Sequence, residues 1–405
     1  MTHIEQMIQD MCPNGVEWKT LGEVAMRNKG MNITAAQMKK IENNNGNIRI
    51  FAAGNTKVDA LESDIPASSI IREPSIIVKS RGNIGFEYYD QPFTHKNEMW
   101  SYSNFKGADI KFVYYYLQNL VQLFQQKARA NSVKLPQLCV ADTDSFAIPI
   151  PPLEIQKKIV ECLDKFSALA AELQAELQAE LHLRRKQYEY YRTQLLTPHS
   201  DCNSADKSDD CNWDFKPLGE ICDLVKDRIS ASELDEDTYV SVENLLSNKQ
   251  GKIPSMSVPT IGNVINYHKD NVLIGNIRPY LRKIWLADNE GGTNGDVITL
   301  GIKSKYRDMI LPRFLYHALA DERFFIYDTQ YSSGAKMPRG DKDKVMEYQI
   351  AIPSIKKQAE LVEFLDKFDK LTTSLEEGIP AEQIRQQKRY EYFRDLLLTF
   401  DRKAV

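Results

Sequence analysis

The sequence predicts an α+β protein with two pseudo-symmetric globular domains of mixed helix and strand, joined by a long antiparallel helical pair that forms a coiled coil. The first observation behind this prediction is an internal repeat: Ile150-Pro151-Pro152-Leu153 returns 202 residues later as Ile352-Pro353-Ser354-Ile355. A period of half the chain indicates two copies of a whole domain, whereas periods of ~20–50 residues indicate solenoids. The second observation is a long run of helical periodicity after each motif. The third is a mixture of short β-type runs and helical runs ahead of each motif.

The repeat extends upstream of these motifs. Lys134-Leu135-Pro136 returns as Lys336-Met337-Pro338 at the same spacing. Near the start of each half, Leu21-Gly22-Glu23-Val24 matches Leu218-Gly219-Glu220-Ile221, but 197 residues apart. Between these points the halves do not align, so each half is a variable block followed by a constant block. Such a chain suits the recognition of two different targets from one common frame.

The constant blocks predict long helices. The stretch from Leu153 to Leu196 has no Pro or Gly, and its apolar residues recur every three or four positions. A helix of ~44 residues would be ~66 Å long at ~1.5 Å per residue, too long to be buried in one domain. It needs a long partner, and the matching segment from Ile355 to Leu398 is the candidate. In that segment Gly378 suits the position after a helix and Pro380 the first turn of a new one, so two shorter helices are expected there.

The variable blocks predict mixed structure. β-type runs at Ser75–Val78 and Asn271–Ile274 alternate with loops, and helical stretches are expected at Phe112–Gln126 and Arg313–Phe325. A polar, acidic stretch without aromatic residues between the two copies is typical of a linker. The predicted parts are a first globular domain at 1–150, a central helix at 151–197, a linker at 198–211, a second globular domain at 212–352 and distal helices at 353–400.

Composition limits the class of protein. Hydrophobic residues make up 42% and charged residues 27% of the 405 residues, as in ordinary globular proteins. No apolar run approaches the ~18 residues of a membrane span, and the N-terminal segment lacks the apolar core of a signal peptide. A cytoplasmic protein with no membrane partner is therefore expected. None of the six cysteines forms a Cys-x-x-Cys pair, so free thiols are expected.

One stretch of the central helix repeats a tetrapeptide. Ala171-Glu172-Leu173-Gln174 is followed by Ala175-Glu176-Leu177-Gln178 and then by Ala179-Glu180-Leu181. All four residue types are strong helix formers. The plainest interpretation of the repeat is a stable amphipathic helix.

In this order, the motifs resemble those of the specificity subunit of type I restriction–modification enzymes, over essentially the whole chain. The opening from Cys12 to Trp18 is similar to that family's N-terminus. The motif from Ile150 to Gln156, with Lys186-Gln187-Tyr188-Glu189-Tyr190-Tyr191-Arg192, resembles its central conserved region. The run from Gly378 to Glu382, with Lys388-Arg389-Tyr390-Glu391-Tyr392-Phe393-Arg394, resembles its distal one.

The resemblance implies a function. Each variable block would be a target-recognition domain that reads one half of a split site in double-stranded DNA. The conserved helices would hold the two domains apart and dock two methyltransferase subunits, which the restriction (motor-nuclease) subunits join. The number of tetrapeptides would set the spacer between the half-sites. Four helical residues add ~6 Å, nearly two base-pair steps of ~3.4 Å.

No catalytic motif is recognisable in the chain. It has neither the glycine loop and Asn/Asp-Pro-Pro-aromatic motif of a DNA methyltransferase nor a Walker-type loop. Its six histidines form no metal-ligand pair. We therefore expect no catalytic residue, cofactor or metal in this chain, and we expect AdoMet, ATP and Mg²⁺ on the partner subunits. An independent nuclease or methyltransferase is disfavoured.

Base reading needs hydrogen-bonding side chains on loops, with Arg or Lys for guanine and Asn or Gln for adenine. Residues of these types form three polar loop clusters in each block. Lys134 and Lys336 match between the copies and are expected to contact phosphate, which positions the protein without specifying sequence. The divergent residues are expected to select the sequence, and a solvated surface role is the alternative for each. In the first block the candidates are Lys79, Arg81, Asn83, His95, Lys96, Asn97, Arg129, Asn131 and Lys134. In the second block they are Asn276, Arg278, Tyr280, Arg282, Lys283, Asn294, Ser333, Lys336 and Arg339.

The aromatic-basic motif of each constant block has two interpretations. It could stack on nucleic acid, but helix packing and partner docking are favoured, because Tyr188, Tyr191 and Leu195 fall on one helical face. Arg192 could pair with Glu189 or with an acid of a partner. The candidates for this role are Tyr188, Tyr191, Arg192, Tyr390, Phe393 and Arg394.

A second class of function stays open at this point. The net charge of −4 disfavours a protein that coats nucleic acid nonspecifically, although a sequence-specific reader remains compatible with it. Near-neutral halves also fit an assembly adaptor, whose globular ends would bind proteins instead of DNA. Footprinting separates these classes, because an adaptor gives no bipartite protection of DNA.

Overall fold

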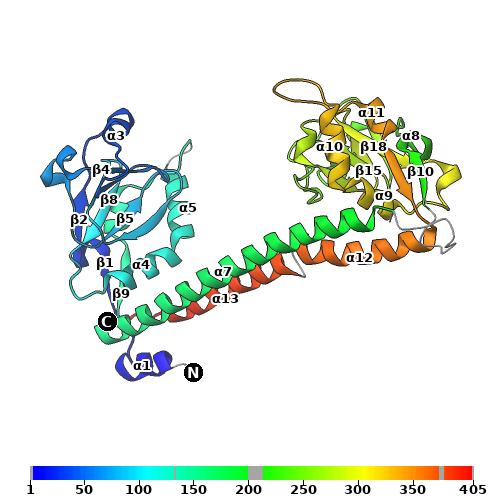
Figure 1. Cartoon of the computed structure of the whole chain (residues 1–405). Coiled ribbons are helices and arrows are strands. Elements are labelled where there is room, and N and C mark those ends of the chain that lie inside the picture. The colour runs from blue at the N-terminus through cyan, green and yellow to red at the C-terminus, as the bar shows by residue number, and fades with distance from the viewer. Residues whose placement is uncertain (1–2, 132–133, 199–212, 374–377, 404–405) are drawn as a thin grey trace. The chain divides into compact units, whose positions relative to one another are not determined.

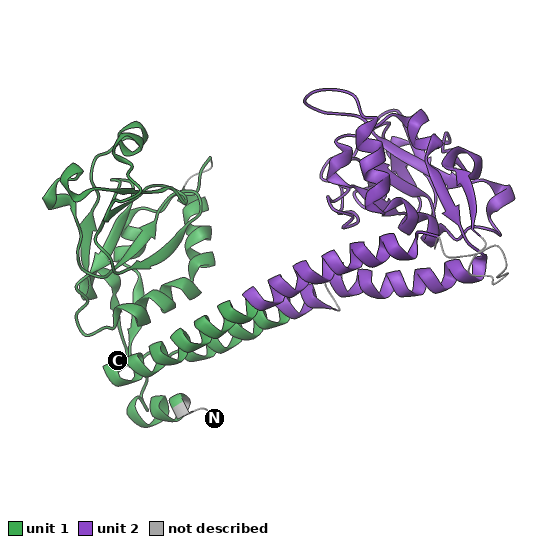
Figure 2. Cartoon of the chain, viewed as in Figure 1, with its two compact units in different colours: residues 1–174, 385–405 green, residues 175–384 purple. Residues whose placement is uncertain are grey.

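A computed structural model describes residues 3–131, 134–198, 213–373 and 378–403. It divides into two compact units, each with one globular domain and segments of both helical copies (Figure 2). Unit 1 comprises residues 1–174 and 385–405, and unit 2 comprises residues 175–384. The predicted linker falls almost entirely on residues 199–212, which lie outside the described residues.

The globular domain of unit 1 contains three small sheets (Figure 1). Its four-stranded sheet has the order β2-β8-β5-β6, its three-stranded sheet has the order β4-β3-β7, and β1 pairs with β9. Alternating apolar residues of β5 and β8 bury one face of the larger sheet against α4 and α5. The helices are α1 (His3–Met11), α2 (Leu21–Val24), α3 (Ala35–Ile41), α4 (Ile110–Asn119), α5 (Val121–Asn131) and α6 (Val140–Asp144). The strands are β1 (Glu17–Thr20), β2 (Met26–Lys29), β3 (Ile48–Phe51), β4 (Lys57–Ala60), β5 (Ser75–Lys79), β6 (Gly85–Tyr89), β7 (Phe93–His95), β8 (Trp100–Ser103) and β9 (Ala147–Ile150).

The globular domain of unit 2 follows the same plan. Its main sheet has the order β11-β18-β15-β16, a second sheet has the order β12-β14-β17-β13, and β10 pairs with β19. The helices are α8 (Leu218–Ile221), α9 (Pro312–Leu319), α10 (Glu322–Gln330) and α11 (Lys342–Glu347). The strands are β10 (Asp214–Pro217), β11 (Cys222–Leu224), β12 (Arg228–Ser230), β13 (Tyr239–Val240), β14 (Asn263–Tyr267), β15 (Val272–Gly275), β16 (Ile284–Leu286), β17 (Gly291–Thr293), β18 (Val297–Ile302) and β19 (Gln349–Ile352).

The long helices are confirmed. One continuous helix, α7, spans Leu153–Leu195, whereas the second copy forms α12 (Ile355–Thr373) and α13 (Ile379–Leu397). Gly378, just before α13, has φ +86°, and a Cβ there would lie 2.6 Å from the carbonyl oxygen of Leu371. Glycine is therefore required where α12 gives way to α13, and Pro380 lies in the first turn of α13 as expected.

Within each unit the two helical segments run antiparallel (Figure 1). In unit 1, α7 lies against α13: the rings of Phe166 and Phe393 stack with centroids 5.7 Å apart. In unit 2, α7 lies against α12: Tyr188 stacks on Phe368 at 5.9 Å, and the Arg185 guanidinium donates to the carbonyl oxygen of Thr372 at 3.4 Å. Residue numbers rise along α7 while they fall along its partner, which confirms the antiparallel pair.

The predicted helices at 112–126 and 313–325 are wrong in one respect, because each is two helices. The first breaks at Leu120, between α4 and α5. The second breaks at Ala320–Asp321, where the Asp321 carboxylate accepts a hydrogen bond from the Arg323 N–H and caps α10. Apolar periodicity continues across both breaks, so the period alone could not reveal them.

Each globular domain is anchored to α7 or α12 by matching contacts. The buried Gln156 side chain accepts from the Asp109 N–H at 2.6 Å and donates to the Pro151 carbonyl at 2.7 Å. At the matching position 202 residues later, Gln358 accepts from the Leu311 N–H at 2.9 Å and donates to the Pro353 carbonyl at 2.9 Å. The repeat in sequence is thus a repeat in hydrogen bonding.

Candidate nucleic-acid interface

The three candidate loop clusters of the first block come together in unit 1. The loop after β5 pairs with the segment after α5, since the Gly82 N–H donates to the Pro136 carbonyl at 3.0 Å and the Leu138 N–H donates to the Ser80 carbonyl at 2.9 Å. The Ser80 hydroxyl also donates to the carbonyl of Glu98, in the loop between β7 and β8. Residues far apart in sequence therefore form one surface.

The second block builds the same arrangement in unit 2. The Arg278 N–H donates to the Pro338 carbonyl at 2.7 Å, and the Gly340 N–H donates to the Asn276 carbonyl at 3.0 Å. The Asn276 N–H in turn donates at 2.9 Å to the carbonyl of Asp296, in the loop between β17 and β18. The same three-loop platform is present in both domains.

These matched hydrogen bonds show which loop residues of the two domains correspond, which a comparison of the two half-sequences does not reveal. Because Pro136 corresponds to Pro338, Gly82 corresponds to Arg278, with a spacing of 196 residues instead of 202. Both have positive φ, +73° for Gly82 and +54° for Arg278. Arg81, which forms a β-bridge with Gln137, then corresponds to Ile277, not to Arg278. The two candidate arginines therefore occupy neighbouring, not identical, positions of the platform.

Most candidates of the first block lie at the surface. Two of the cations have acidic partners: Lys79 pairs with Glu87 at 2.9 Å and Lys96 with Glu98 at 2.9 Å. The exposed candidates are Arg81, Asn83, Asn97, Arg129, Asn131 and Lys134.

His95 does not lie at the surface, contrary to the expectation. It is fully buried in β7, where its ring lies 3.2 Å from the Ser101 hydroxyl. Burial lowers the pKa of His95 to about 4, so the imidazole is neutral near pH 7. Polar residues at 94–97 predict a surface loop, but Thr94 and His95 belong to the buried strand β7.

The candidates of the second block divide in the same way. Asn276 is buried beneath the platform. Arg282 is held by Glu322, with Nε 3.0 Å from the carboxylate, and Lys283 donates to the Val242 carbonyl at 2.6 Å. Asn294 is partly buried. The exposed candidates are Arg278, Tyr280, Ser333, Lys336 and Arg339.

A cavity of about 400 Å³ opens on the platform of unit 2. Arg278, Lys283 and Asn294 line it together with Tyr239, Ser241 and Glu243 and other residues. Tyr239, Ser241 and Glu243 were not predicted, because they alternate with apolar residues and do not form a cluster of basic or amide side chains. They add hydroxyl and carboxylate groups to the amide and cationic donors, a mixture that suits recognition of base edges.

The matched lysines lie on matched loops. In unit 2, Ser333 and Arg339 exchange backbone hydrogen bonds of 2.9 and 2.8 Å, which close a loop that projects between α10 and α11 (Figure 1). In unit 1 the Asn131 side-chain amide donates to the Gln137 carbonyl at 3.3 Å across the equivalent positions. Lys134 and Lys336 are exposed on these loops. Their equivalent placement in the two domains fits the expected contact with DNA phosphate, which is the same in every DNA sequence.

The aromatic-basic motif packs helices in both copies. Tyr188 is 4% exposed and Arg192 only 1%, and the Arg192 guanidinium donates to the Ala320 carbonyl at 2.9 Å and lies 3.3 Å from Glu189. In unit 1 the Tyr390 hydroxyl bonds Ser167 at 2.9 Å. Tyr191 packs against Phe368 of α12, and Phe393 stacks on Phe166 of α7. Arg394 pairs with Asp395 of its own helix. The expected pairing of Arg192 with Glu189 is confirmed.

The described residues offer neither a metal-ion site nor a membrane-spanning helix. They contain no group of three or more His, Cys, Asp or Glu side chains placed to hold a metal ion. In the same part of the chain, no helix has the length and apolar character needed to cross a membrane.

Comparison with known proteins gives a consistent match. A family model described as the type I restriction modification DNA specificity domain matches residues 13–183 and again residues 211–383. A putative type I restriction enzyme specificity subunit of Haemophilus influenzae is 30% identical over 98% of both chains. The EcoR124I/EcoR124II specificity subunit of Escherichia coli is 26% identical over 99% of this chain and 97% of its own. A solved chain from work on assembly and conformational transition of the type I R-M system shares the fold, with TM-score 0.62 at 15% identity over 95% and 98% of the two chains.

Proposed function

The chain belongs to the family of type I restriction–modification specificity subunits, and from this premise we propose that each three-loop platform reads one half of a bipartite DNA site. The chain is thus a DNA-recognition subunit and not a catalytic one. The proposed recognition domains are residues 1–150 and 212–352. AdoMet, ATP and Mg²⁺ would be bound by partner subunits.

The observation that carries the proposal is the doubled platform. Its backbone contacts are shared, as with Gly82–Pro136 and Arg278–Pro338, whereas its exposed side chains differ. A common backbone with unlike donors and acceptors is what two different half-sites require. Lys134 and Lys336, which are alike, would contact phosphate in both half-sites.

The helical segments would dock the partners. We expect two methyltransferase subunits to bind them, because each unit presents an equivalent pair of antiparallel segments, and restriction subunits to join that core. The buried Tyr188 and Arg192 support the helices from inside, so docking would use exposed residues of the same motif, such as Tyr190 and Tyr392, which are 62% and 65% exposed. A cytoplasmic location would follow from action on chromosomal DNA.

Mapping of methylated sites tests the proposal. The chain is expressed with its partner methyltransferase subunits, and modified positions are mapped across a genome. The expected result is one bipartite motif with a nonspecific spacer. A single uninterrupted motif, or methylation independent of this chain, would contradict the proposal.

The tetrapeptide repeat provides a further test of the spacer. Deletion of Ala175–Gln178 removes four residues from α7, about 6 Å of helix. The expected result is a shorter preferred spacer with both half-sites unchanged. An unchanged spacer would exclude a role of the repeat as a ruler.

A further inference from the structure

Strained backbone gathers at the platform of unit 2. Six non-glycine residues have positive φ in the described parts of the chain, and four of them are Asn248, Lys249, Arg278 and Arg282, with φ between +52° and +62°. Positive φ is costly for residues with a Cβ, and it persists where surrounding contacts hold it. In unit 1 the position of Arg278 is occupied by Gly82, for which this conformation is unstrained.

The strained segments hold one another. The Asn248 N–H donates to the Leu281 carbonyl at 2.8 Å, and the Lys249 N–H donates to the Arg282 carbonyl at 2.9 Å. The loop that carries Lys249 therefore fixes the last residues of the candidate base-reading loop, 276–283.

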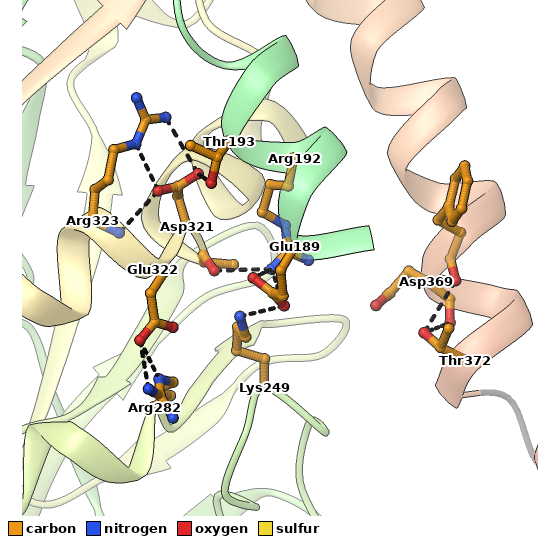
Figure 3. Close-up of polar contacts among 12 residues, drawn as sticks. Glu189, Arg192, Thr193, Lys249, Arg282, Asp321, Glu322, Arg323, Asp369 and Thr372 are labelled. Atoms are coloured by element: carbon orange, nitrogen blue, oxygen red, sulfur yellow. Dashed lines mark hydrogen bonds and ion pairs between the residues drawn. The ribbon is translucent and has the colours of Figure 1, made fainter. Parts of the chain in front are cut away.

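A ring of charged residues fastens both segments to α7 (Figure 3). The Lys249 ammonium lies 2.5 Å from the Glu189 carboxylate on α7, and Arg192 lies 3.3 Å from the same carboxylate. The Arg192 guanidinium also donates to the Ala320 carbonyl, just before α10. The first turn of α10 carries Glu322, which holds Arg282. The contacts thus lead from α7 to the loop of Lys249, on to Arg282 of the platform loop and to the start of α10, and from there back to α7.

Two cations of this ring are withdrawn from water, whereas Arg282 and Glu322 are 37% and 35% exposed. The side chains of Lys249 and Arg192 are 9% and 1% exposed, whereas that of Glu189 is 36% exposed. Burial, aided by the Arg192 cation, lowers the pKa of Lys249. Removal of the Glu189 carboxylate leaves the buried Lys249 ammonium without this ion pair, which is more costly than the loss of a surface ion pair.

The matching residues of the second helical copy, which lie on α13 in unit 1, make other contacts. Glu391, which corresponds to Glu189, accepts from Gln387 of its own helix at 2.7 Å. Arg394, which corresponds to Arg192, pairs with Asp395 at 3.2 Å. The same two residue types are therefore used differently in the two units.

We propose that Glu189 and Lys249 are positioning residues, which hold the strained loop 276–283 in its reading conformation and so set base discrimination in the half-site read by the second domain. The inference rests on the proposed function of the platforms. It assigns a role in specificity to a residue of the constant helix, outside the divergent loops.

The test uses the complete chain assembled with its methyltransferase partners. Methylation rates are measured on duplexes that carry single base changes in either half-site, for Glu189→Gln and Lys249→Met. Glu180→Gln, an exposed change on the same helix, is the matched control. Arg81→Ala and Arg278→Ala identify the half-site that belongs to each domain.

The expected result is about a tenfold loss of discrimination for both variants, in the half-site affected by Arg278→Ala alone. Lys249→Arg, which keeps the charge, should restore most of it, and the control should match wild type. Unchanged discrimination, or equal loss in both half-sites, would overturn the inference, whatever the thermal stability. If Glu189→Gln prevents assembly, Lys249→Met decides alone, since it leaves α7 unaltered. Failure of Arg81→Ala and Arg278→Ala to separate the half-sites would instead count against the proposed function.

Discussion

The two globular domains share a four-stranded sheet and a two-stranded sheet, and they differ in the third. In each, four strands in the same order carry the platform, β2-β8-β5-β6 in unit 1 and β11-β18-β15-β16 in unit 2. The third sheet has the order β4-β3-β7 in unit 1 but β12-β14-β17-β13 in unit 2. The part that supports the platform is therefore alike in the two copies, and the difference in strand order lies in this third sheet.

The spacing between equivalent residues shows how this difference arises. It is 197 at the first strand pair, where Glu17 faces Ile150 and Asp214 faces Ile352, 196 at Ser80 and Asn276, and 202 from Pro136 and Pro338 onward. A few net insertions therefore separate two copies of one framework.

The first prediction concerns the framework, where the copies should respond alike. Gln156→Ala and Gln358→Ala each remove a buried amide and leave backbone groups without partners. We expect each to lower the free energy of unfolding of its unit by about 3 kcal/mol. Urea denaturation followed by hydrogen exchange in each unit measures this, with the exposed Gln174→Ala as control. A large loss in one unit only would break the equivalence.

The second prediction concerns pH. Burial lowers the pKa of His317 to about 4, and its ring faces Asp366 at 2.7 Å beside Arg313. Since an unfolded histidine takes up its proton near pH ~6.5, unit 2 should lose stability as the pH falls from about 6.5 to 4, by about 3 kcal/mol at most. His317→Gln should flatten this dependence in unit 2, while His95→Gln should do so in unit 1. Urea titrations at several pH values decide, and an unchanged slope in both variants would contradict the prediction.

The third prediction separates the platforms. Arg81→Ala and Arg278→Ala should each relax base discrimination by about 1–3 kcal/mol, because a bidentate contact to a base would be lost. Each substitution should affect one half-site only, and the two substitutions should affect different half-sites. Methylation rates on substituted duplexes measure it. Loss in both half-sites from one substitution would refute the division of labour between the domains.

The fourth prediction concerns the feature that the platforms share. Lys134→Ala and Lys336→Ala should weaken binding to all DNA sequences alike. Each should also reduce the slope of the logarithm of the binding constant against the logarithm of the salt concentration by about 1. Binding titrations at several salt concentrations measure both quantities. A change in sequence preference would show that these lysines contact bases instead of phosphate.

The frame of the molecule could be predicted from the sequence, because helical periodicity and a gap-free repeat depend only on local order along the chain. The continuous α7, the break near Gly378 and the strands around Val78 and Ile274 follow from such signals. The burial of His95 could not be predicted, since polarity does not reveal which side of a strand faces the core. Pairing across loops likewise depends on tertiary contacts, so the correspondence of Gly82 with Arg278 emerged only from hydrogen bonds.

The pairing of the first and last strands of each domain has a consequence of its own. β1 pairs with β9, and β10 pairs with β19, so that Glu17 lies opposite Ile150 and Asp214 opposite Ile352. The chain therefore enters and leaves each domain at neighbouring positions, so that each domain is a self-contained module. A domain of different sequence, with the same paired ends, could replace either one without any change in the register of the helices. New specificities would then arise by exchange of whole modules, with no redesign of the scaffold.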